Sequence, residues 1–409
     1  MKVAWFTVAA AFAVSVSSAQ EASYGIDVPV TLSGGILDTH RLQSEDAGQS
    51  PVSGGFRVML YPTLKLGAHW FGYAAVQVRL TPYFYYDAFS PERELYTDTI
   101  QAYVGYQTRV RGTSLVVKAG QMVTAFGSFP LRYDDTQNPL LDQPLSYITE
   151  LPLRSDQLVC NTKDLLWQYY GWVNFGCGGK VGPSGGLTPA TLYGVPGIQV
   201  EASHGRFDGR LQIAGRSPAA SDSWTTGTHY LQWAAGGGYT IRQGFRVGVS
   251  AFRGPYLSSA VAPLLPVGTT PRDFPASAIG FDGQWARGRW SVNAEWQRFQ
   301  FDEPNFTQSP TAVAGYGEAK SVLTPRLYLA GRVGWLKTGG VQDASGRAAA
   351  QYAPTLTSVE MGPGFWIRRN LLFKASYGVL HMQGQSGSRS NVLGAQLVAT
   401  FHGLNWGFR

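Results

Sequence analysis

Long stretches in which apolar and polar residues alternate are the feature that most limits how this chain can fold. In the segment 288–300, apolar side chains occupy every second position from Trp290 to Trp296, with polar residues between them. The segment 325–337 repeats this plan, with Arg332 on its polar face. Because successive side chains of a strand point to opposite faces, this period predicts β-strands with one apolar and one polar face.

Alternation of this kind recurs along almost the whole chain and predicts an all-β fold. We expect 16 strands, with 14 and 18 as alternatives and with boundaries uncertain by a few residues. The predicted segments are 25–35, 54–64, 68–81, 94–109, 113–123, 191–204, 206–217, 226–241, 243–253, 275–286, 288–301, 311–322, 325–337, 355–368, 370–383 and 391–403.

Three observations favour a transmembrane antiparallel β-barrel over a soluble sandwich or barrel. The segments are long, since soluble strands average about 5 or 6 residues and membrane-spanning strands need about 9 to 11. Aromatic residues stand near the ends of the apolar faces, as in the girdles of membrane barrels. The opposite faces carry charge and glycine, although only 14% of the chain is charged, against about 25% in soluble proteins. The predicted interior of the barrel is therefore polar and accessible to water.

The connections between the segments alternate in length. Short ones lie around Gly205, Arg242, Gly288 and Arg369, whereas 254–274 is an example of a long one. Outer-membrane barrels pair tight periplasmic turns with longer outer loops. The alternation therefore supports the same architecture.

The amino terminus predicts export. Met1-Lys2 is followed by an apolar stretch to Val16 and by Ser17-Ser18-Ala19, which together are typical of a signal peptide over residues 1–19. A membrane anchor would need about 20 apolar residues. Without Lys2, the remaining 32 basic and 26 acidic residues leave a net charge of +6 on the barrel domain, residues 20–409. This mild surplus does not indicate nucleic-acid binding.

Cys160 and Cys177 are the only cysteines, and they lie in one glycine-rich segment. In an exported protein this pair predicts a disulfide. A metal site is the alternative, but two cysteines need further ligands, and the nearest downstream histidine is His204. No metal and no cofactor is expected.

Residues 124–190 interrupt the alternation after the fifth predicted strand. The segment contains six prolines together with many aromatic side chains, and an ordered connection of this length inside a barrel is usually functional. We expect it to fold into the lumen or to cap the barrel mouth, with an exposed subdomain as the alternative. Its candidate constriction residues are Arg132, Asp134, Asp135, Asp142, Glu150, Arg154 and Asp156.

This arrangement resembles the 16-stranded trimeric porins of Gram-negative outer membranes. In those porins the third outer loop folds inward and forms the constriction. The stretch from Lys118 to Gly127 is similar to a Gly-Gln…Phe-Gly element in the phosphate-selective porin type. The resemblance implies a homotrimer in outer-membrane lipid. Two departures are the cysteine pair and a chain end in which Arg409 follows Phe408, where porins of this kind end on an aromatic residue.

The polar faces of the strands predict which side chains line such a pore. The predicted pore-lining basic residues are Arg57, Lys118, Arg210, Arg246, Arg326, Arg332 and Lys374, and the acidic ones are Glu201, Asp208, Asp282, Glu295 and Glu360. Charge rings set ion selectivity, and this small basic surplus predicts a weak anion preference at most. Residues 124–179 contain more acidic than basic residues. The resemblance to phosphate-selective porins therefore does not imply phosphate specificity here. Small polar or ionic solutes are expected.

The chain also carries patterns that functions other than a diffusion channel would use. Phe71, Tyr73 and the aromatic run 83–86 offer a track for stacking sugars, although girdle or loop packing is the favoured interpretation. The Gly-x-Ser-x-Gly pattern at 182–186 indicates a nucleophile only between a strand and a helix, and six scattered histidines form no ligand motif. We therefore expect no enzyme. A non-conducting barrel with a binding or structural role is the alternative.

Overall fold

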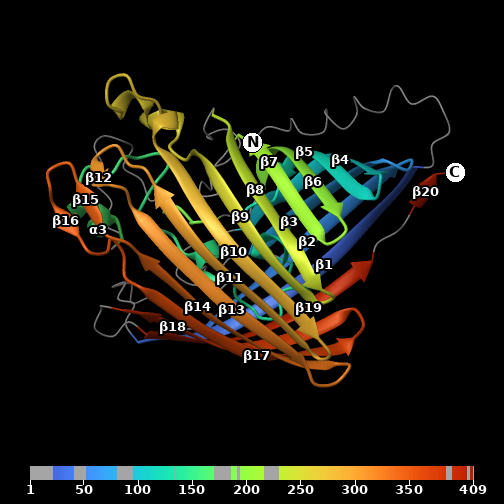
Figure 1. Cartoon of the computed structure of the whole chain (residues 1–409). Helices are drawn as coiled ribbons and strands as arrows, with labels where there is room; N and C mark the ends of the chain where they lie inside the picture. Colours follow the sequence, from blue (N-terminus) through green and yellow to red (C-terminus); the bar gives the residue numbers. More distant parts are fainter. Residues whose placement is uncertain are drawn as a thin grey trace.

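In the computed structural model, sixteen long strands form one closed antiparallel barrel (Figure 1). The structure describes residues 22–40, 52–80, 95–132, 134–169, 186–190, 194–215, 230–383, 389–402 and 406–408. The barrel strands are β1 (Ala22–His40), β2 (Val52–Leu66), β3 (Trp70–Leu80), β4 (Leu95–Val110), β5 (Thr113–Met122), β6 (Val195–His204), β7 (Phe207–Ala214), β8 (Gln232–Arg242), β9 (Phe245–Pro255), β10 (Pro275–Arg287), β11 (Trp290–Phe301), β13 (Thr311–Val322), β14 (Leu327–Thr338), β17 (Leu356–Arg368), β18 (Leu371–Met382) and β19 (Arg389–His402).

The first strand closes the barrel. β1 pairs with β2, where Thr31 lies opposite Arg57, and with the last long strand β19, where Val28 lies opposite Phe401. Every other barrel strand pairs with its neighbour in chain order. Each of the sixteen predicted segments overlaps one of these strands, so the predicted 16-stranded antiparallel barrel is confirmed.

Tight turns join the strands at one end of the barrel. Between β4 and β5 the turn residues Arg111 and Gly112 have φ angles of 49° and 82°. These left-handed values suit a two-residue hairpin that follows the strand twist. Glycine supplies the same conformation at Gly205 and Gly288. This end is called the short-turn end below.

Smaller elements lie at the opposite, long-loop end. The insertion after β5 contains η2 (Phe129–Arg132), α2 (Leu145–Ile148) and α3 (Thr162–Tyr169). η3 (Ser259–Leu264) and η4 (Pro271–Asp273) connect β9 to β10, and β12 (Phe306–Gln308), β15 (Val341–Asp343) and β16 (Ala348–Ala349) form a separate small sheet near α3 (Figure 1). β20 (Trp406–Phe408) pairs with the start of β1, so the aromatic residues that precede Arg409 join the barrel sheet after β19 has ended. None of the described helices is long and apolar enough to cross a membrane.

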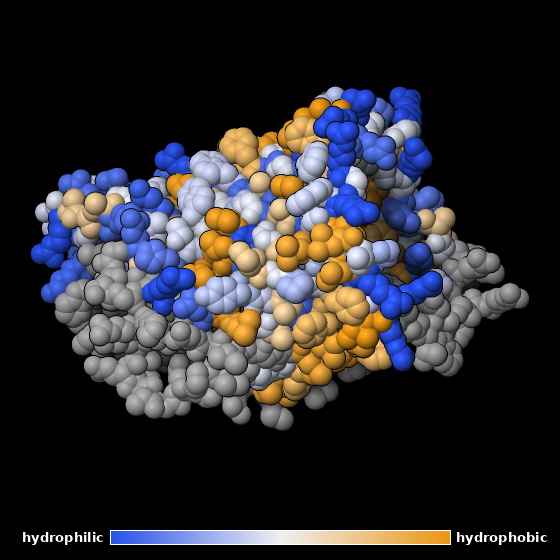
Figure 2. Space-filling view, turned by 90° about the horizontal axis from the view of Figure 1, so that it is seen from below, coloured by the Kyte–Doolittle hydropathy of each residue, from blue (hydrophilic) through white to orange (hydrophobic). Residues whose placement is uncertain are grey.

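The two faces of the barrel wall differ as the alternation predicts. In β14, Leu329 and Val333 are 50% and 56% exposed, whereas Arg332 between them is 4% exposed. The exposed face of the other strands is also apolar, and Figure 2 shows hydrophobic residues gathered along the outside of the wall. The buried polar face therefore points into the barrel.

The main apolar core joins side chains of the insertion, among them Phe126, Phe129 and Tyr147, to buried residues of β8 through β17. Phe126 makes edge-to-face contacts with Phe252 and Phe299, whose ring centroids lie 5.0 and 5.8 Å from its own. These contacts hold the insertion against one part of the wall.

Candidate functional site

The insertion meets the wall through hydrogen bonds that begin directly after β5. Arg210 of β7 donates from Nε to the carbonyl of Ala125 over 2.9 Å and from Nη2 to the carbonyl of Gly127. The Gly127 amide donates to Ser250 Oγ of β9 over 3.1 Å. The Ser128 amide donates to Glu295 Oε1 of β11 over 2.9 Å. Strand side chains thus take up backbone groups that an irregular segment leaves unpaired.

A chain of alternating charges continues this contact. Arg132 of the insertion places Nη1 2.7 Å from Glu318 Oε1 of β13, and Arg332 Nη2 lies 2.5 Å from Glu318 Oε2. Arg332 Nη1 also lies 3.6 Å from Glu360 Oε2 of β17. Glu360 Oε1 accepts the amides of Leu141 and Asp142. Buried charges are tolerated because each has opposite charge and hydrogen bonds around it.

Lys374 of β18 and Arg57 of β2 hold the next part of the insertion. Lys374 is 1% exposed, and its Nζ donates to the carbonyls of Asp135, Asn138 and Leu140 over 2.8, 3.2 and 3.1 Å. Arg57 Nη1 lies 3.3 Å from Asp135 Oδ1, and Thr31 Oγ1 of β1 donates to Asp135 Oδ2 over 2.9 Å. The segment 125–142 is therefore bonded to the inner wall from β7 and β9 through β18 to β1 and β2.

Two cavities lie between this segment and the remaining wall. One has a volume of about 380 Å³ and is lined by inner-face residues of β5 to β10, including Asp208, Arg210 and Arg246. The other has a volume of about 410 Å³ and is lined by residues of β2 to β6, including Tyr73. Leu131 of the insertion and Glu201 of β6 line both, so the cavities adjoin. Leu131 is 52% exposed, which shows that this side of the insertion faces open space.

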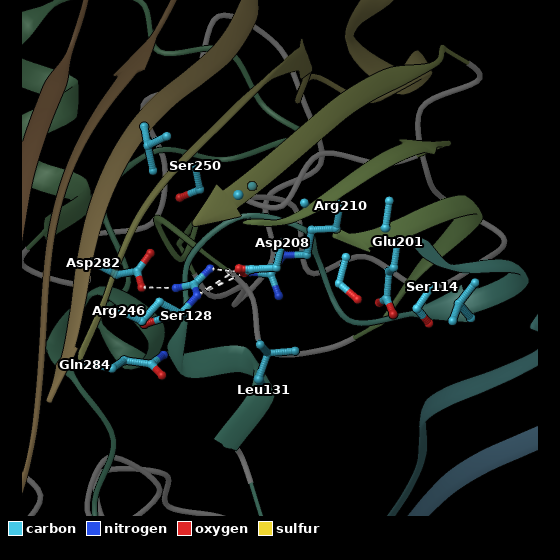
Figure 3. A pocket seen from close by; sticks show the side chains of 17 residues that line it. Ser114, Ser128, Leu131, Glu201, Asp208, Arg210, Arg246, Ser250, Asp282 and Gln284 are labelled. Carbon is cyan, nitrogen blue, oxygen red and sulfur yellow. Dashed lines mark hydrogen bonds and ion pairs between the residues drawn. The ribbon is translucent and has the colours of Figure 1, made fainter. Parts of the chain in front are cut away.

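Opposite charges alternate along the wall of the cavities. Arg246 of β9 lies between Asp208 of β7 and Asp282 of β10, with nitrogen–oxygen distances of 2.6 and 2.8 Å (Figure 3). Lys118 Nζ of β5 lies 2.7 Å from Glu201 Oε1 of β6. The charged residues that line the cavities are Lys118, Arg210 and Arg246 against Asp134, Glu201, Asp208 and Asp282. The basic surplus of the predicted pore lining is not repeated in this part of the wall.

Tyrosines and amides complete the larger cavity. Tyr61, Tyr73 and Tyr103 line it. The ring centroid of Tyr73 lies 6.2 Å from that of Tyr61 and 5.4 Å from that of Tyr103. Tyr61 donates its hydroxyl to Asp134 Oδ2 over 2.5 Å. Gln101, Gln137 and Gln199 supply amide groups. Tyr73 therefore faces the interior and is not part of an outer girdle, whereas residues 83–86 lie outside the described residues.

The predicted site residues differ in the contacts that they make. Apart from Arg326, every predicted pore-lining residue contacts another inner-face residue or the insertion. Arg326 is exposed and precedes β14, so it does not lie on the inner face of that strand: β14 begins at Leu327, two residues later than the predicted segment 325–337. Within the insertion, Arg132, Asp134, Asp135 and Asp142 reach the inner wall.

The other insertion residues pair locally. Arg154 holds Asp156 in a bidentate contact with distances of 2.9 and 2.8 Å, which keeps the pKa of Asp156 below its usual value. Glu150 Oε2 accepts the amide of Gly186 over 2.9 Å. Cys177 lies outside the described residues, so its disulfide with Cys160 stays a prediction.

Glu318 and the inner glutamines were not among the predicted site residues. Glu318 follows Tyr316 on the same face of β13, and this shared face was the signal that could have revealed it. Buried glutamines occupy the inner faces of many strands, namely Gln77, Gln101, Gln121, Gln199, Gln212, Gln232, Gln297 and Gln396. Among the described residues, no group of three or more histidine, cysteine, aspartate or glutamate side chains could hold a metal ion.

Comparison with known proteins gives the fold. No family model matches the chain, and no curated protein matches its sequence. The outer membrane channel DcaP of Acinetobacter baumannii superposes with a TM-score of 0.55 at 9% identity, over 95% of this chain and 99% of that one. An anion-selective porin from Comamonas acidovorans gives 0.55 at 8%, over 93% and 100%.

The barrel has a porin fold. Pseudomonas putida OprB, at a TM-score of 0.52 and 12% identity over 93% of this chain and 94% of that one, agrees with this result. At these identities the likeness concerns the architecture alone.

Proposed function

We propose that this protein is an outer-membrane porin through which small polar or ionic solutes diffuse passively. The observation that carries the proposal is the pair of adjoining cavities between the insertion and the wall of β2 to β10, joined at Leu131 and Glu201. Porin neighbours with the same barrel support it. The apolar outer face and the polar inner face suit a barrel in lipid that surrounds water.

In this proposal residues 124–142 fold inward and form the constriction. The bonds of Arg132, Asp135 and the carbonyls held by Lys374 support such a position, because their partners lie on the inner faces of strands around the barrel. Ion selectivity is weak because charges of both signs lie in contact along the passage, and the basic surplus of the whole predicted pore lining gives an anion preference at most. Its aromatic and amide lining suits uncharged polar solutes as well.

The remaining parts of the proposal rest on the sequence. They are cleavage of residues 1–19, export to the outer membrane and assembly as a homotrimer. Cross-linking of the detergent-extracted protein, followed by mass determination, tests the trimer. Mass spectrometry of the same material tests the cleavage site.

A barrel closed by its insertion is the second candidate, with a binding or structural role. The apolar cluster of Phe126, Phe129 and Tyr147 favours it, because such packing could seal the lumen. Catalysis is the least favoured alternative, since the Gly-x-Ser-x-Gly pattern at 182–186 and the six histidines give no catalytic or ligand motif in the sequence.

Conductance of the purified protein in a planar bilayer under a salt gradient distinguishes these candidates. A porin gives stable steps with a small reversal potential. An absence of steps from protein that keeps β-rich circular dichroism and heat-dependent gel mobility would exclude the open channel. A large reversal potential of the sign expected for anion selectivity would show that a basic constriction lies elsewhere in the lumen.

A further inference from the structure

Arginine is concentrated at the short-turn end of the barrel. Seven tight turns join strands there, and six of them contain an arginine or directly follow one. We name this set the arginine collar; its members are Arg109, Arg111, Arg206, Arg242, Arg287, Arg289, Arg326, Arg368 and Arg369, and all are exposed. The seventh turn, between β2 and β3, is flanked by the exposed residues Lys65 and His69. The collar alone holds nine of the chain's 33 lysines and arginines.

No acidic residue balances this charge within the turns. The stretches 65–71, 109–113, 204–207, 241–245, 286–290, 322–327 and 367–371 contain no aspartate or glutamate. In the part of the chain that the structure describes, no collar arginine forms an ion pair. Figure 2 shows strongly hydrophilic residues at both ends of the wall, the right edge among them. The collar is therefore an unneutralised positive rim.

Some collar guanidinium groups are fixed along this rim. Arg206 Nη1 donates to the carbonyl of Ile241 in the next hairpin over 3.1 Å. Arg289 Nη1 donates to the carbonyl of Leu323 in the same way over 3.5 Å. Each bond uses one of the five N–H donors of a guanidinium group. The remaining donors are available to an anion.

Exposed aromatic residues stand directly beside the collar. Phe207 follows Arg206 and is 64% exposed, and Trp290 follows Arg289 and is 53% exposed. Trp70, which is 51% exposed, follows the turn between β2 and β3. Aromatic side chains at the edge of an apolar band mark the level at which hydrocarbon meets lipid headgroups. The collar therefore lies at headgroup level at the periplasmic side of the proposed barrel.

We propose that the arginine collar binds the phosphate groups of anionic phospholipids in the leaflet that surrounds the short-turn end. Guanidinium groups match phosphate in geometry and in charge. The distribution of the collar selects a lipid surface over a soluble anion, because the turns are spread around a 16-stranded barrel that is tens of ångströms across. A small solute meets one or two of these groups, whereas a leaflet meets all of them. This inference does not depend on whether the barrel conducts.

The test measures which lipid the folded protein retains. The full chain is reconstituted into vesicles of phosphatidylcholine with about one-fifth phosphatidylglycerol and is then extracted gently with detergent, and its bound lipid is quantified. We expect phosphatidylglycerol to be enriched roughly three-fold over the bulk at low salt and to fall toward the bulk ratio at about 0.5 M salt, as screening predicts. No enrichment at low salt would overturn the proposal.

Matched variants locate the binding. R206Q/R242Q/R287Q/R289Q removes four collar charges and is expected to lower the enrichment to near the bulk ratio. R253Q/R272Q/R298Q/R347Q removes four exposed arginines nearer the long-loop end and is expected to keep it. Equal losses in both variants would mean that net charge alone attracts the lipid, which contradicts a site at the collar. Replacement of the same four collar residues by lysine is expected to retain most of the enrichment and shows that the positions tolerate change.

Two further arms separate other sources of anion. Inorganic phosphate is expected to displace the lipid no better than chloride at equal ionic strength, and a specific effect of phosphate would indicate a small-anion site. A soluble anionic glycan is tested against the detergent-solubilised protein. If the four-glutamine collar variant loses glycan binding but keeps its lipid enrichment, the ligand of the collar is an anionic polymer and not a phospholipid. Heat-dependent gel mobility verifies that every variant is folded.

Discussion

At the scale of single residues, buried charge is concentrated where the insertion meets the wall. Arg332 is 4% exposed, and its guanidinium contacts both Glu318 and Glu360. Its Nη1 and Nη2 also donate to Asp142 O and Asn138 Oδ1 over 2.7 and 2.8 Å. One side chain thus joins three strands to the insertion. Removing it leaves two carboxylates without their main counter-charge.

We therefore expect Arg332→Ala to destabilise the barrel by about 3–5 kcal/mol, the range found when one partner of a buried ion pair is removed. Urea unfolding in vesicles, followed by tryptophan fluorescence, measures the change. The matched control is Arg347→Ala, since Arg347 is exposed in the loop before β16 and should change stability by no more than about 0.5 kcal/mol. Equal effects of the two substitutions would contradict a structural role for the charge network.

Glu303, outside the barrel strands, makes the contact between the insertion and the loop after β11 dependent on pH. Burial raises the pKa of Glu303 to about 8, and its Oε1 accepts the Val159 amide over 3.4 Å. Because the folded pKa lies above the unfolded one, the contact is most stable below about pH 4.5 and loses stability as the pH rises to about 8. The protection factor of the Val159 amide, which corrects for the intrinsic pH dependence of exchange, should therefore fall over this window. Glu303→Gln should abolish the dependence, and an unchanged profile in this variant would assign it to another group.

At the scale of elements, the alternation of side chains explains how much could be predicted. Each strand places polar residues on one face over its whole length, so strand positions and most inner-face charges could be inferred from the sequence alone. Single residues at strand ends could not, because a strand boundary that moves by two positions, from 325 to Leu327, leaves Arg326 in a turn. The partners of Arg132 also could not be inferred, since nothing local to it specifies Glu318.

The turn 135–140 of the insertion depends on one ammonium group. Lys374→Met removes the donor to three carbonyls while keeping most of the side-chain volume, and should loosen this turn without disrupting β18. In the proposed porin we expect larger and noisier single-channel steps, on the order of 1.5-fold in conductance, as the constriction widens. Lys337→Met, at an exposed position of β14, is the control and should give wild-type steps. Single-channel steps of wild-type size in Lys374→Met would mean that this turn does not line the conducting path.

At the scale of the whole molecule, the inner wall has two unlike halves. The insertion bonds mainly to β9 through β18, and the cavities follow β2 through β10. Ions crossing the proposed pore would therefore pass Arg246 and its two aspartates at close range. The selectivity of the channel should depend on this small group of charges more than on the net charge of the chain.

Arg246→Ala would leave Asp208 and Asp282 without the guanidinium between them. The net charge of the passage would become one unit more negative. We expect the cation-to-anion permeability ratio to rise by roughly a factor of two. Reversal potentials under a salt gradient measure the ratio. Arg298→Ala, an exposed position on the outer face of β11, provides the comparison. A shift of the same size in both variants would argue that the Arg246 group lies outside the ion path.

The bonds that seat the insertion also dictate an order of events during biogenesis. Arg132 and Glu318 are separated by 186 residues along the chain, and Lys374 and Asp135 by 239. Their binding partners on β13 through β18 do not exist as a surface until the carboxy-terminal half of the wall has formed. Since contacts of such long sequence separation form late and slowly, the insertion lacks these bonds until β13 through β18 have formed, although Arg57 of β2 and Arg210 of β7 can bind it earlier. In the proposed porin, a nascent barrel would thus pass through a stage in which fewer bonds hold the constriction than in the finished protein.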